Sequence, residues 1–279
     1  MQIIFWGCRG SIPVPGKDTL RYGGNTTCVE VRLGDGTVII LDAGTGIRNL
    51  GKDLLKRNDL HELYLFFTHP HWDHIAGFPF FAPAYSDKYL IHIRGGPIAK
   101  ETIKGYLEHQ MQQPFFPVRL QSMKARFDFT SGVPIVRNIG TSVVTPITLS
   151  HPIGYGFKIS EGDTSLVFLP DNELDFKHEN GAALYQYINF CRDADLLIHD
   201  TQYTDEEYRK AEGWGHSRYS SVVNLAVKAK VKRLCIFHHN PDHSDDDVDM
   251  IYSACSKLIT VQKSTLQCFA PQEGSEISI

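Results

Sequence analysis

The 279-residue chain has no uninterrupted apolar run near the about 18 residues needed to span a bilayer, so a membrane protein is not expected. It also lacks low-complexity tracts and Pro/Ser-rich linkers, which predicts a single domain over residues 1–279 with one large core. There is no excess of basic residues, since the formal net charge is −4. Phosphate-backbone binding needs a concentrated basic surface, so nucleic acid is not the expected partner.

The six cysteines form no C-x-x-C pair, and we expect buried free thiols in a reducing compartment rather than a disulfide framework. The first residues carry neither the basic leader nor the small-residue cleavage site of a signal peptide. The expected location is therefore the cytoplasm.

Three histidines and an aspartate lie close together directly after an apolar run. They are His69, His71, Asp73 and His74, and the run covers residues 63–67. This order predicts a buried strand that ends in a tight loop and delivers four metal-binding side chains to one point. Nitrogen and oxygen ligands suit zinc and similar metals, and a catalytic site leaves one position open for water. The alternative is a polar surface loop.

The rest of the chain alternates between strand and helix patterns. Strands are predicted at 3–6, 27–33, 37–41, 63–67, 89–93, 142–149, 156–160, 165–169, 196–198, 233–237 and 265–269. Helices are predicted at 47–56, 74–84, 98–111, 183–191, 220–229 and 246–258. Two comparable halves predict an α+β fold of two mixed sheets face to face with helices outside, an αββα sandwich. The aromatic-rich segment at about 83–129 is either a lid-like insertion over the site or part of the core.

Three further metal-ligand candidates each follow a predicted strand in the second half: His151, Asp171 and His238. Strand ends converge where such folds build their pockets, so these side chains are expected near the histidine loop. His239 lies next to His238, and the register could shift by one. His238 is favoured by the strand end, and His243 is a weaker candidate.

The order of these motifs resembles the metallo-β-lactamase fold superfamily, and most closely its phosphodiesterase branch, which includes ribonuclease Z and small cyclic-phosphodiester hydrolases. The resemblance runs from the N-terminal strand to about residue 245. The segments at 5–13 and 22–28 resemble the opening of bacterial cyclic-nucleotide phosphodiesterase-like members of that fold.

The resemblance implies two divalent metal ions, with zinc expected and manganese or iron as alternatives. It assigns one metal to His69, His71 and His151, the other to Asp73, His74 and His238, and a bridging role to Asp171. The chain departs from the usual Gly-Asp-Thr in having Pro170-Asp171-Asn172. Redox members carry glutamate at the position of His71, and β-lactamases often carry cysteine at that of Asp171, so hydrolysis of a phosphodiester is favoured.

The resemblance also implies roles outside the ligand set. Asp42 would brace the histidine loop, or it caps a turn before Gly44. His216, in the segment 214–217, would face the scissile phosphate and protonate the leaving oxygen, although Ser217 there could simply start the next helix. Asp200 would orient His216, and Asp73 would double as acceptor of a proton from water.

The expected activity is hydrolysis of a small phosphodiester, with a cyclic nucleotide as the expected substrate and a metal-bridging hydroxide as the nucleophile. A ribonuclease Z-like RNA endonuclease is the first alternative, but only 28 residues separate Asp171 from Asp200, which leaves little room for a basic tRNA-binding arm. A lactone or thioester hydrolase is the second. A catalytically silent binding module is a third, and the complete ligand set argues against it. The resemblance also implies a homodimer.

Overall fold

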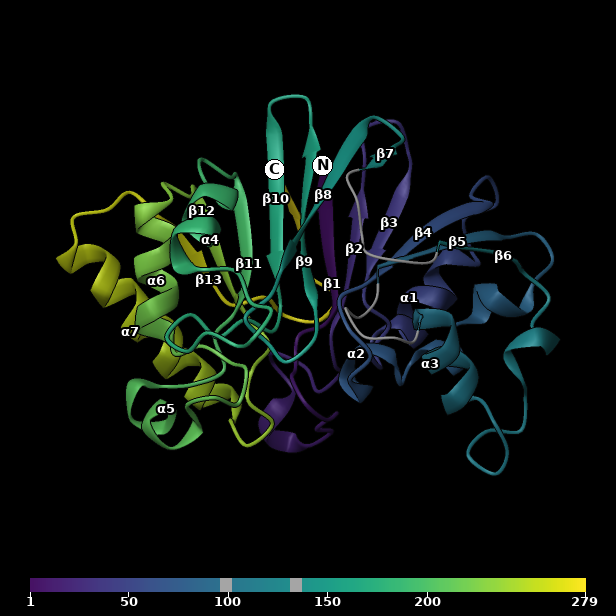
Figure 1. The fold of residues 1–279 in the computed structure, drawn as a ribbon, viewed down its shortest axis with the longest axis horizontal. Helices are drawn as coiled ribbons and strands as arrows, with labels where there is room; N and C mark the ends of the chain where they lie inside the picture. Colours follow the sequence, from purple (N-terminus) through teal and green to yellow (C-terminus); the bar gives the residue numbers. More distant parts are fainter. Residues whose placement is uncertain (96–101, 131–136) are drawn as a thin grey trace.

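The structure, a computed structural model, describes residues 1–95, 102–130 and 137–279, which fold into two β-sheets packed face to face with helices outside (Figure 1). Among these residues each sheet has seven strands. The first sheet consists, in spatial order, of β14 (Glu276–Ser278), β1 (Gln2–Gly7), β2 (Cys28–Arg32), β3 (Val38–Leu41), β4 (Glu62–Phe67), β5 (Leu90–Gly95) and β6 (Arg126–Phe129). The second consists of β13 (Gln267–Phe269), β12 (Arg233–Phe237), β11 (Leu196–Asp200), β10 (Thr164–Leu169), β9 (Tyr155–Glu161), β8 (Ser142–Thr148) and β7 (Arg137–Ile139). The predicted αββα sandwich is confirmed.

Helices cover the outer face of each sheet. They are α1 (Ile47–Leu54), α2 (Trp72–Ile75), α3 (Ile103–Gln110), α4 (Leu184–Phe190), α5 (Asp205–Ala211), α6 (Tyr219–Lys228) and α7 (Asp245–Val261). Buried side chains of α1 and α3 join the core of the first sheet, and those of α4, α6 and α7 join that of the second. Within the described part of the chain, every helix is too short or too polar to cross a membrane.

The strand β3 shows why apolar runs end up between these layers. Successive side chains of a strand point to opposite faces. Ile39 and Leu41 accordingly pack into the core between the two sheets, while Val38 and Ile40 pack toward the helices on the outside. All four are buried, so the strand has a continuous apolar sequence rather than an alternating one.

The helix predicted at 74–84 is wrong. The structure has the short α2 there, followed by two 3₁₀ turns, Phe78–Phe80 and Ala82–Tyr85. Pro79 and Pro83 explain the breaks, because proline lacks an N–H and fits only the first turn of a helix. For the helix predicted at 98–111, the structure confirms α3, whereas residues 98–101 lie outside the described residues.

The segment at about 83–129 contributes two strands, β5 and β6, to the edge of the first sheet. The buried side chains of Ile103, Leu107 and Met111 belong to the same core as this sheet. Much of the segment is therefore core, and its role as a lid stays a prediction.

A buried carboxylate, that of Glu30 on β2, connects strands β1 and β2 to the segment that follows α1. It accepts hydrogen bonds from Trp6 Nε1 at 3.0 Å, Arg32 Nε at 2.7 Å and Arg57 Nη1 at 2.6 Å. Burial alone raises the pKa of Glu30, but Arg32 and Arg57 outweigh it and hold the pKa below its usual value of 4.5.

Replacing Glu30 by glutamine is expected to lower the free energy of unfolding by about 2 kcal/mol at neutral pH, because hydrogen bonds to a charged acceptor are lost. The folded-state pKa is depressed, so this contribution is present above pH 4.5 and disappears as the pH falls through the lower folded-state pKa. Urea denaturation of both proteins at pH 7 and under acid conditions measures the effect. An equal difference at both pH values would contradict this role of Glu30.

Candidate metal centre

The candidate ligands gather at one edge of the sandwich, where several strands end. The histidine loop follows β4, and Asp171 and His238 follow the mutually parallel part of the second sheet, at the ends of β10 and β12. His151 lies beyond the end of β8. Carboxyl ends of neighbouring parallel strands meet at one sheet edge, which brings these side chains together.

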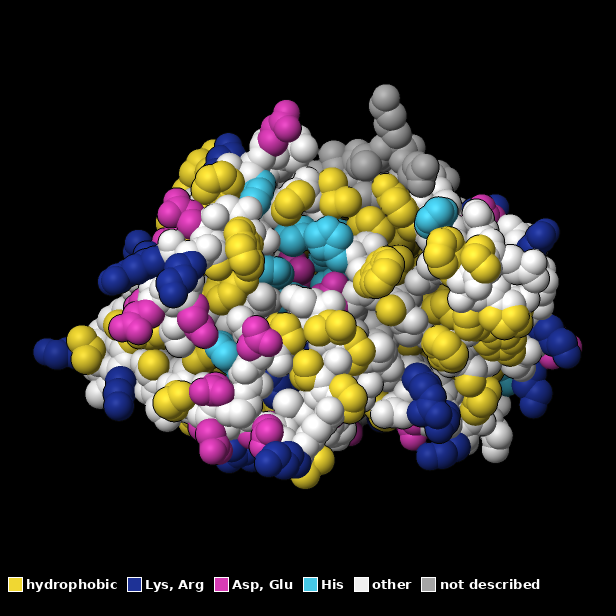
Figure 2. All heavy atoms as spheres, turned by 90° about the horizontal axis from the view of Figure 1, so that it is seen from below, with side chains coloured by type: hydrophobic (Ala, Val, Ile, Leu, Met, Phe, Trp, Pro, Cys, Tyr) yellow, Lys and Arg dark blue, Asp and Glu magenta, His cyan; other side chains and the backbone are white. Residues whose placement is uncertain are grey.

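Figure 2 looks onto this edge and shows histidine and acidic side chains at the bottom of a hollow. The hollow contains a cavity of about 450 Å³. The residues that line it are Ser11, Pro70, His71, Trp72, Asp73, Asp171 and His216.

The first ligand cluster comprises His69, His71, His151 and Asp171, whose ligand atoms all lie within 4.8 Å of one another. Nε2 of His69 and Nε2 of His151 lie 2.9 and 3.1 Å from the same atom, Nδ1 of His71. His71 Nδ1 has either one proton to donate or one lone pair to accept with, so it can form a normal hydrogen bond with only one of these two atoms.

The hydrogen-bond partners of Nδ1 in His151 and His69 indicate which ring nitrogens of these two histidines carry a proton. His151 Nδ1 faces the carbonyl oxygen of Gly215 at 3.2 Å and therefore carries the proton. Thr68 Oγ1 donates to Asp42 at 2.9 Å, which leaves it to accept from His69 Nδ1, also at 2.9 Å. Both Nε2 atoms are thus left with lone pairs that point at one place, as metal-ligating histidines require.

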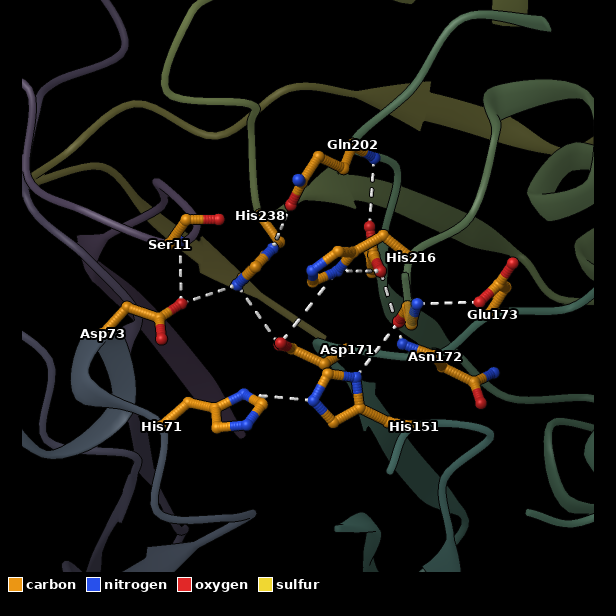
Figure 3. Close-up of polar contacts among 12 residues, drawn as sticks. Ser11, His71, Asp73, His151, Asp171, Asn172, Glu173, Gln202, His216 and His238 are labelled. Atoms are coloured by element: carbon orange, nitrogen blue, oxygen red, sulfur yellow. Dashed lines mark hydrogen bonds and ion pairs between the residues drawn. The ribbon is translucent and has the colours of Figure 1, made fainter. Parts of the chain in front are cut away.

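The second cluster comprises Asp73, His74, Asp171 and His238. Figure 3 shows Asp73, Asp171 and His238 pointing toward one another. His74 Nδ1 donates to Asp42 Oδ2 at 2.8 Å, and His238 Nδ1 donates to Gln202 Oε1 at 2.9 Å. Their Nε2 atoms then face carboxylate oxygens of Asp73 and Asp171 at 3.0–3.2 Å. Burial lowers the pKa of His74, but Asp171, Asp73 and Asp42 outweigh it and raise that pKa well above its usual value, so the ring is protonated when no cation is bound. A divalent cation at this point would replace the proton between nitrogen and oxygen atoms that can both act as metal ligands.

Burial and charge keep three of the ligands, His69, His151 and Asp171, in the protonation state that binds metals. Burial lowers the pKa of His69 well below its usual value and that of His151 to about 3, so both are neutral. Burial raises the pKa of Asp171, but His238 and His74 outweigh it and hold that carboxyl ionised. Among the described residues, His74 Nε2 and Asp171 Oδ1 are buried, lie 3.1 Å apart and have no other hydrogen-bond partner. Two such atoms at the centre show that the residues fit divalent cations.

The interpretation of Asp42 as the residue that braces the histidine loop agrees with its contacts. Besides His74 Nδ1, its carboxylate accepts from the backbone N–H of Thr68 at 2.8 Å. Asp42 (φ 61°), Ser11 (φ 63°) and His238 (φ 56°) all have left-handed backbones, which costs a residue with a side chain about 1–2 kcal/mol. Strain of this kind concentrates at functional sites, where the surrounding contacts hold it.

His216 lies beside the second cluster, and its ring stacks on that of His238 at 5.0 Å between centroids. Its Nδ1 lies 2.9 Å from Asp200 Oδ2, a fully buried carboxylate oxygen. Burial lowers the pKa of His216, but Asp200 outweighs it and raises the pKa to about 9. In the cation-free protein His216 therefore carries two protons at neutral pH, one held by Asp200 and one at Nε2.

The structure brings His238 rather than His239 to the cluster. His239 Nε2 is buried elsewhere, and its ring packs against that of Tyr22 at 5.7 Å. All seven predicted ligands, with His216 and Asp200, lie at one site. The roles assigned to them stay predictions.

Three residues of the site were not identified from the sequence. Gln202 orients His238, and the N–H of Ser11 donates to Asp73 Oδ2 at 2.7 Å. Glu173 is buried, and its carboxylate accepts from the N–H groups of Gly213 and Gly215, each at 2.7 Å. A Cβ on Gly215 would lie 2.3 Å from His151 Nδ1, so only glycine fits this approach.

Replacing Glu173 by glutamine is expected to lower kcat by about 10²-fold, because the loop that carries His216 loses its anchor and the acid moves. In the wild type each carboxylate oxygen of Glu173 accepts from one of the two glycine N–H groups, whereas the glutamine amide has only one oxygen that can accept. Steady-state kinetics and the alkaline limb of the pH–rate profile measure the effect, since a displaced acid shifts that limb. Glu179→Gln, an exposed neighbour, is the control. An unchanged limb and kcat would show that Glu173 does not position the acid.

Comparisons with known proteins agree with this arrangement. A family model described as beta-lactamase superfamily domain matches residues 37–239. A ribonuclease Z from Picrophilus torridus is 24% identical over 88% of this chain and 87% of its own. Among solved structures, yeast PDE1 superposes with a TM-score of 0.71 at 14% identity over 100% of this chain and 99% of its own, and the short form of human tRNase Z with 0.68 at 20% identity over the same shares.

The family model covers well over half of the chain, and the histidine loop, Asp171 and His238 all fall inside the matched residues. The chain therefore belongs to the beta-lactamase superfamily, as a metal-dependent hydrolase of that fold.

Proposed function

We propose that the protein hydrolyses a small phosphodiester, a cyclic nucleotide being the expected substrate. One observation supports this most directly: the ring of His216 lies next to the two clusters of candidate metal ligands, with its Nδ1 2.9 Å from the buried carboxylate of Asp200. Cleavage of a phosphodiester releases an alkoxide, which needs a proton, and an acid beside the phosphate supplies it.

The two clusters would each hold one divalent cation, and Asp171 would serve both, because it belongs to each. Such cations lower the pKa of water toward neutrality and neutralise charge on the phosphoryl oxygens. Zinc is the proposed metal, since nitrogen ligands predominate, with manganese or iron as alternatives.

Side chains of the protein would carry out the proton transfers of the reaction. His216 would donate from Nε2 to the leaving oxygen, while Asp200 holds Nδ1 and stabilises the charged ring. Backbone N–H groups of Gln202 and Ser217 donate to Asp200 at 3.0 and 3.3 Å, which keeps its carboxylate in place. Asp73, held by Ser11, would accept a proton from the attacking water.

An RNA endonuclease is the second candidate, favoured by the ribonuclease Z relatives, which match most of the chain. The structure supports it less. The residues between Asp171 and Asp200 fold back onto the second sheet, where Leu174, Tyr187 and Phe190 pack against its core. This stretch forms no projecting arm that could hold tRNA, so we propose that nucleic acid is not the main partner.

Two further features remain proposals. The six free cysteines, five of them buried, fit a protein of the reducing cytoplasm. A homodimer follows from the resemblance alone.

The test is hydrolysis of bis-(p-nitrophenyl) phosphate, 2′,3′- and 3′,5′-cyclic nucleotides, a transfer RNA precursor and an acyl lactone, with zinc or manganese added. We expect turnover of the diesters and of a cyclic nucleotide. Cleavage of the lactone alone would refute the phosphodiesterase proposal, and cleavage of the RNA alone would establish the second candidate.

A further inference from the structure

Two exposed tryptophans belong to segments that carry cavity residues, one from each half of the fold: Trp72 lies next to His71 and Asp73, and Trp214 is two residues before His216. Trp72, in the histidine loop, lines the cavity and is 81% exposed. Trp214 is 66% exposed and directly precedes Gly215, whose carbonyl contacts His151. The two indoles thus belong to two different segments, far apart in the sequence, that both contribute to the site.

More apolar side chains are exposed near these two. Ile12, next to the cavity residue Ser11, is 57% exposed, and the exposed Phe176 lies 3.9 Å from the Cβ position of Gly213, in the loop of Trp214. Figure 2 shows hydrophobic side chains around the hollow that holds the histidines. A single exposed apolar residue needs no explanation, whereas a group around a cavity indicates a binding surface.

The charge of the cavity limits what can bind there. Its described lining residues include the carboxylates of Asp73 and Asp171 and no lysine or arginine. In Figure 2 the basic side chains lie farther out on this face. A polyanionic RNA strand is normally held by such side chains along its phosphates. A ligand with a single phosphate needs none, because the cations and His216 suffice for it.

We propose that Trp72 and Trp214 form an aromatic clamp, which stacks on the nucleobase of a diester with a single phosphate. Indole faces stack on any base, so the clamp selects nucleotides over simple alkyl esters without choosing among the bases. This inference rests on the proposed phosphodiesterase function and names its substrate class.

A matched pair of substrates tests the selectivity. Thymidine 5′-(p-nitrophenyl phosphate) and methyl p-nitrophenyl phosphate release the same leaving group and differ only in the nucleoside. We expect the wild type to prefer the nucleoside diester in kcat/KM. Trp72→Ala and, separately, Trp214→Ala should each reduce that preference about 10-fold. Tyr185→Ala, on α4 and also 66% exposed, is the control and should leave it unchanged.

Fluorescence provides a second, activity-independent readout on the zinc-loaded protein. The chain has three tryptophans, and the third, Trp6, is partly buried and bonded to Glu30. Adenosine 5′-monophosphate should quench the emission of the wild type and of each single Trp→Phe variant. The double variant Trp72→Phe/Trp214→Phe should show no quenching, and circular dichroism verifies that it is folded.

The outcomes separate the two proposals. Hydrolysis of both diesters with an unchanged preference in the alanine variants overturns the clamp and leaves the phosphodiesterase intact. Quenching without hydrolysis of either diester upholds the clamp and refutes the proposed activity. Quenching that persists in the double variant overturns the clamp, as does a transfer RNA precursor cleaved in preference to the nucleoside diester.

Discussion

Replacing Asp171 by asparagine is expected to reduce turnover of bis-(p-nitrophenyl) phosphate by about 10³-fold or more. Asp171 is the residue common to both ligand clusters, so its loss weakens both cation sites together. The stabilisation that bound metals give to a phosphoryl transition state amounts to several kcal/mol, and each about 1.4 kcal/mol is a factor of ten in rate. Steady-state kinetics with saturating zinc measures the loss.

The variant should remain folded, because asparagine has nearly the same shape and removes a buried charge. Asp163→Asn is a matched control, since Asp163 lies in the exposed turn before the same strand, β10. We expect this control to keep full activity. A folded Asp171→Asn protein with wild-type turnover would refute the assignment of the centre, and His69→Ala should behave like Asp171→Asn.

Replacing His216 by alanine should have an effect that depends on the leaving group. A general acid contributes about 10²–10⁴-fold when the departing oxygen is a strong base. p-Nitrophenolate leaves without a proton, whereas the ribose alkoxide of a cyclic nucleotide does not. We therefore expect a large loss of kcat with the cyclic nucleotide and a small one with bis-(p-nitrophenyl) phosphate. His109→Ala, an exposed histidine, is the control. Equal losses with both substrates would show that His216 is not the acid.

The protonation of His216 can be observed directly. In the cation-free, chelated protein, NMR should show its ring titrating near pH 9, because Asp200 stabilises the imidazolium. The ring is protonated below this pH and loses its proton above it, so activity that needs the acid declines on the alkaline side. Added zinc should lower the midpoint, since a nearby cation repels the imidazolium. A midpoint at or below 6.5 in the chelated protein would contradict the pairing with Asp200.

The ligands could be predicted from the sequence because each one follows an apolar strand. Strand ends are local features, and the parallel arrangement of β10, β11 and β12 converts them into neighbours in space. Asp171 and His238 were identified in this way although 66 residues lie between them. The resemblance supplied the roles of His216 and Asp200, which strand patterns alone do not indicate.

Residues that act through contacts across the fold could not be predicted. Glu173 holds Gly213 and Gly215, about 40 residues later in the chain, and no local pattern marks that pairing. Short strands were also missed: β7 and β14 have three residues each, too few for a periodicity to show. The helix predicted at 74–84 was wrong although the decisive signals were local. Pro79 and Pro83 break the helix despite the helical spacing of the apolar residues.

The two ligand clusters are proposed to bind two divalent cations. Metal analysis of the purified protein, after incubation with zinc and removal of the excess, tests this most directly. The account predicts two equivalents of zinc per chain, one for each cluster. A folded protein that retains no zinc would contradict it, and would indicate a superfamily member that binds without catalysing.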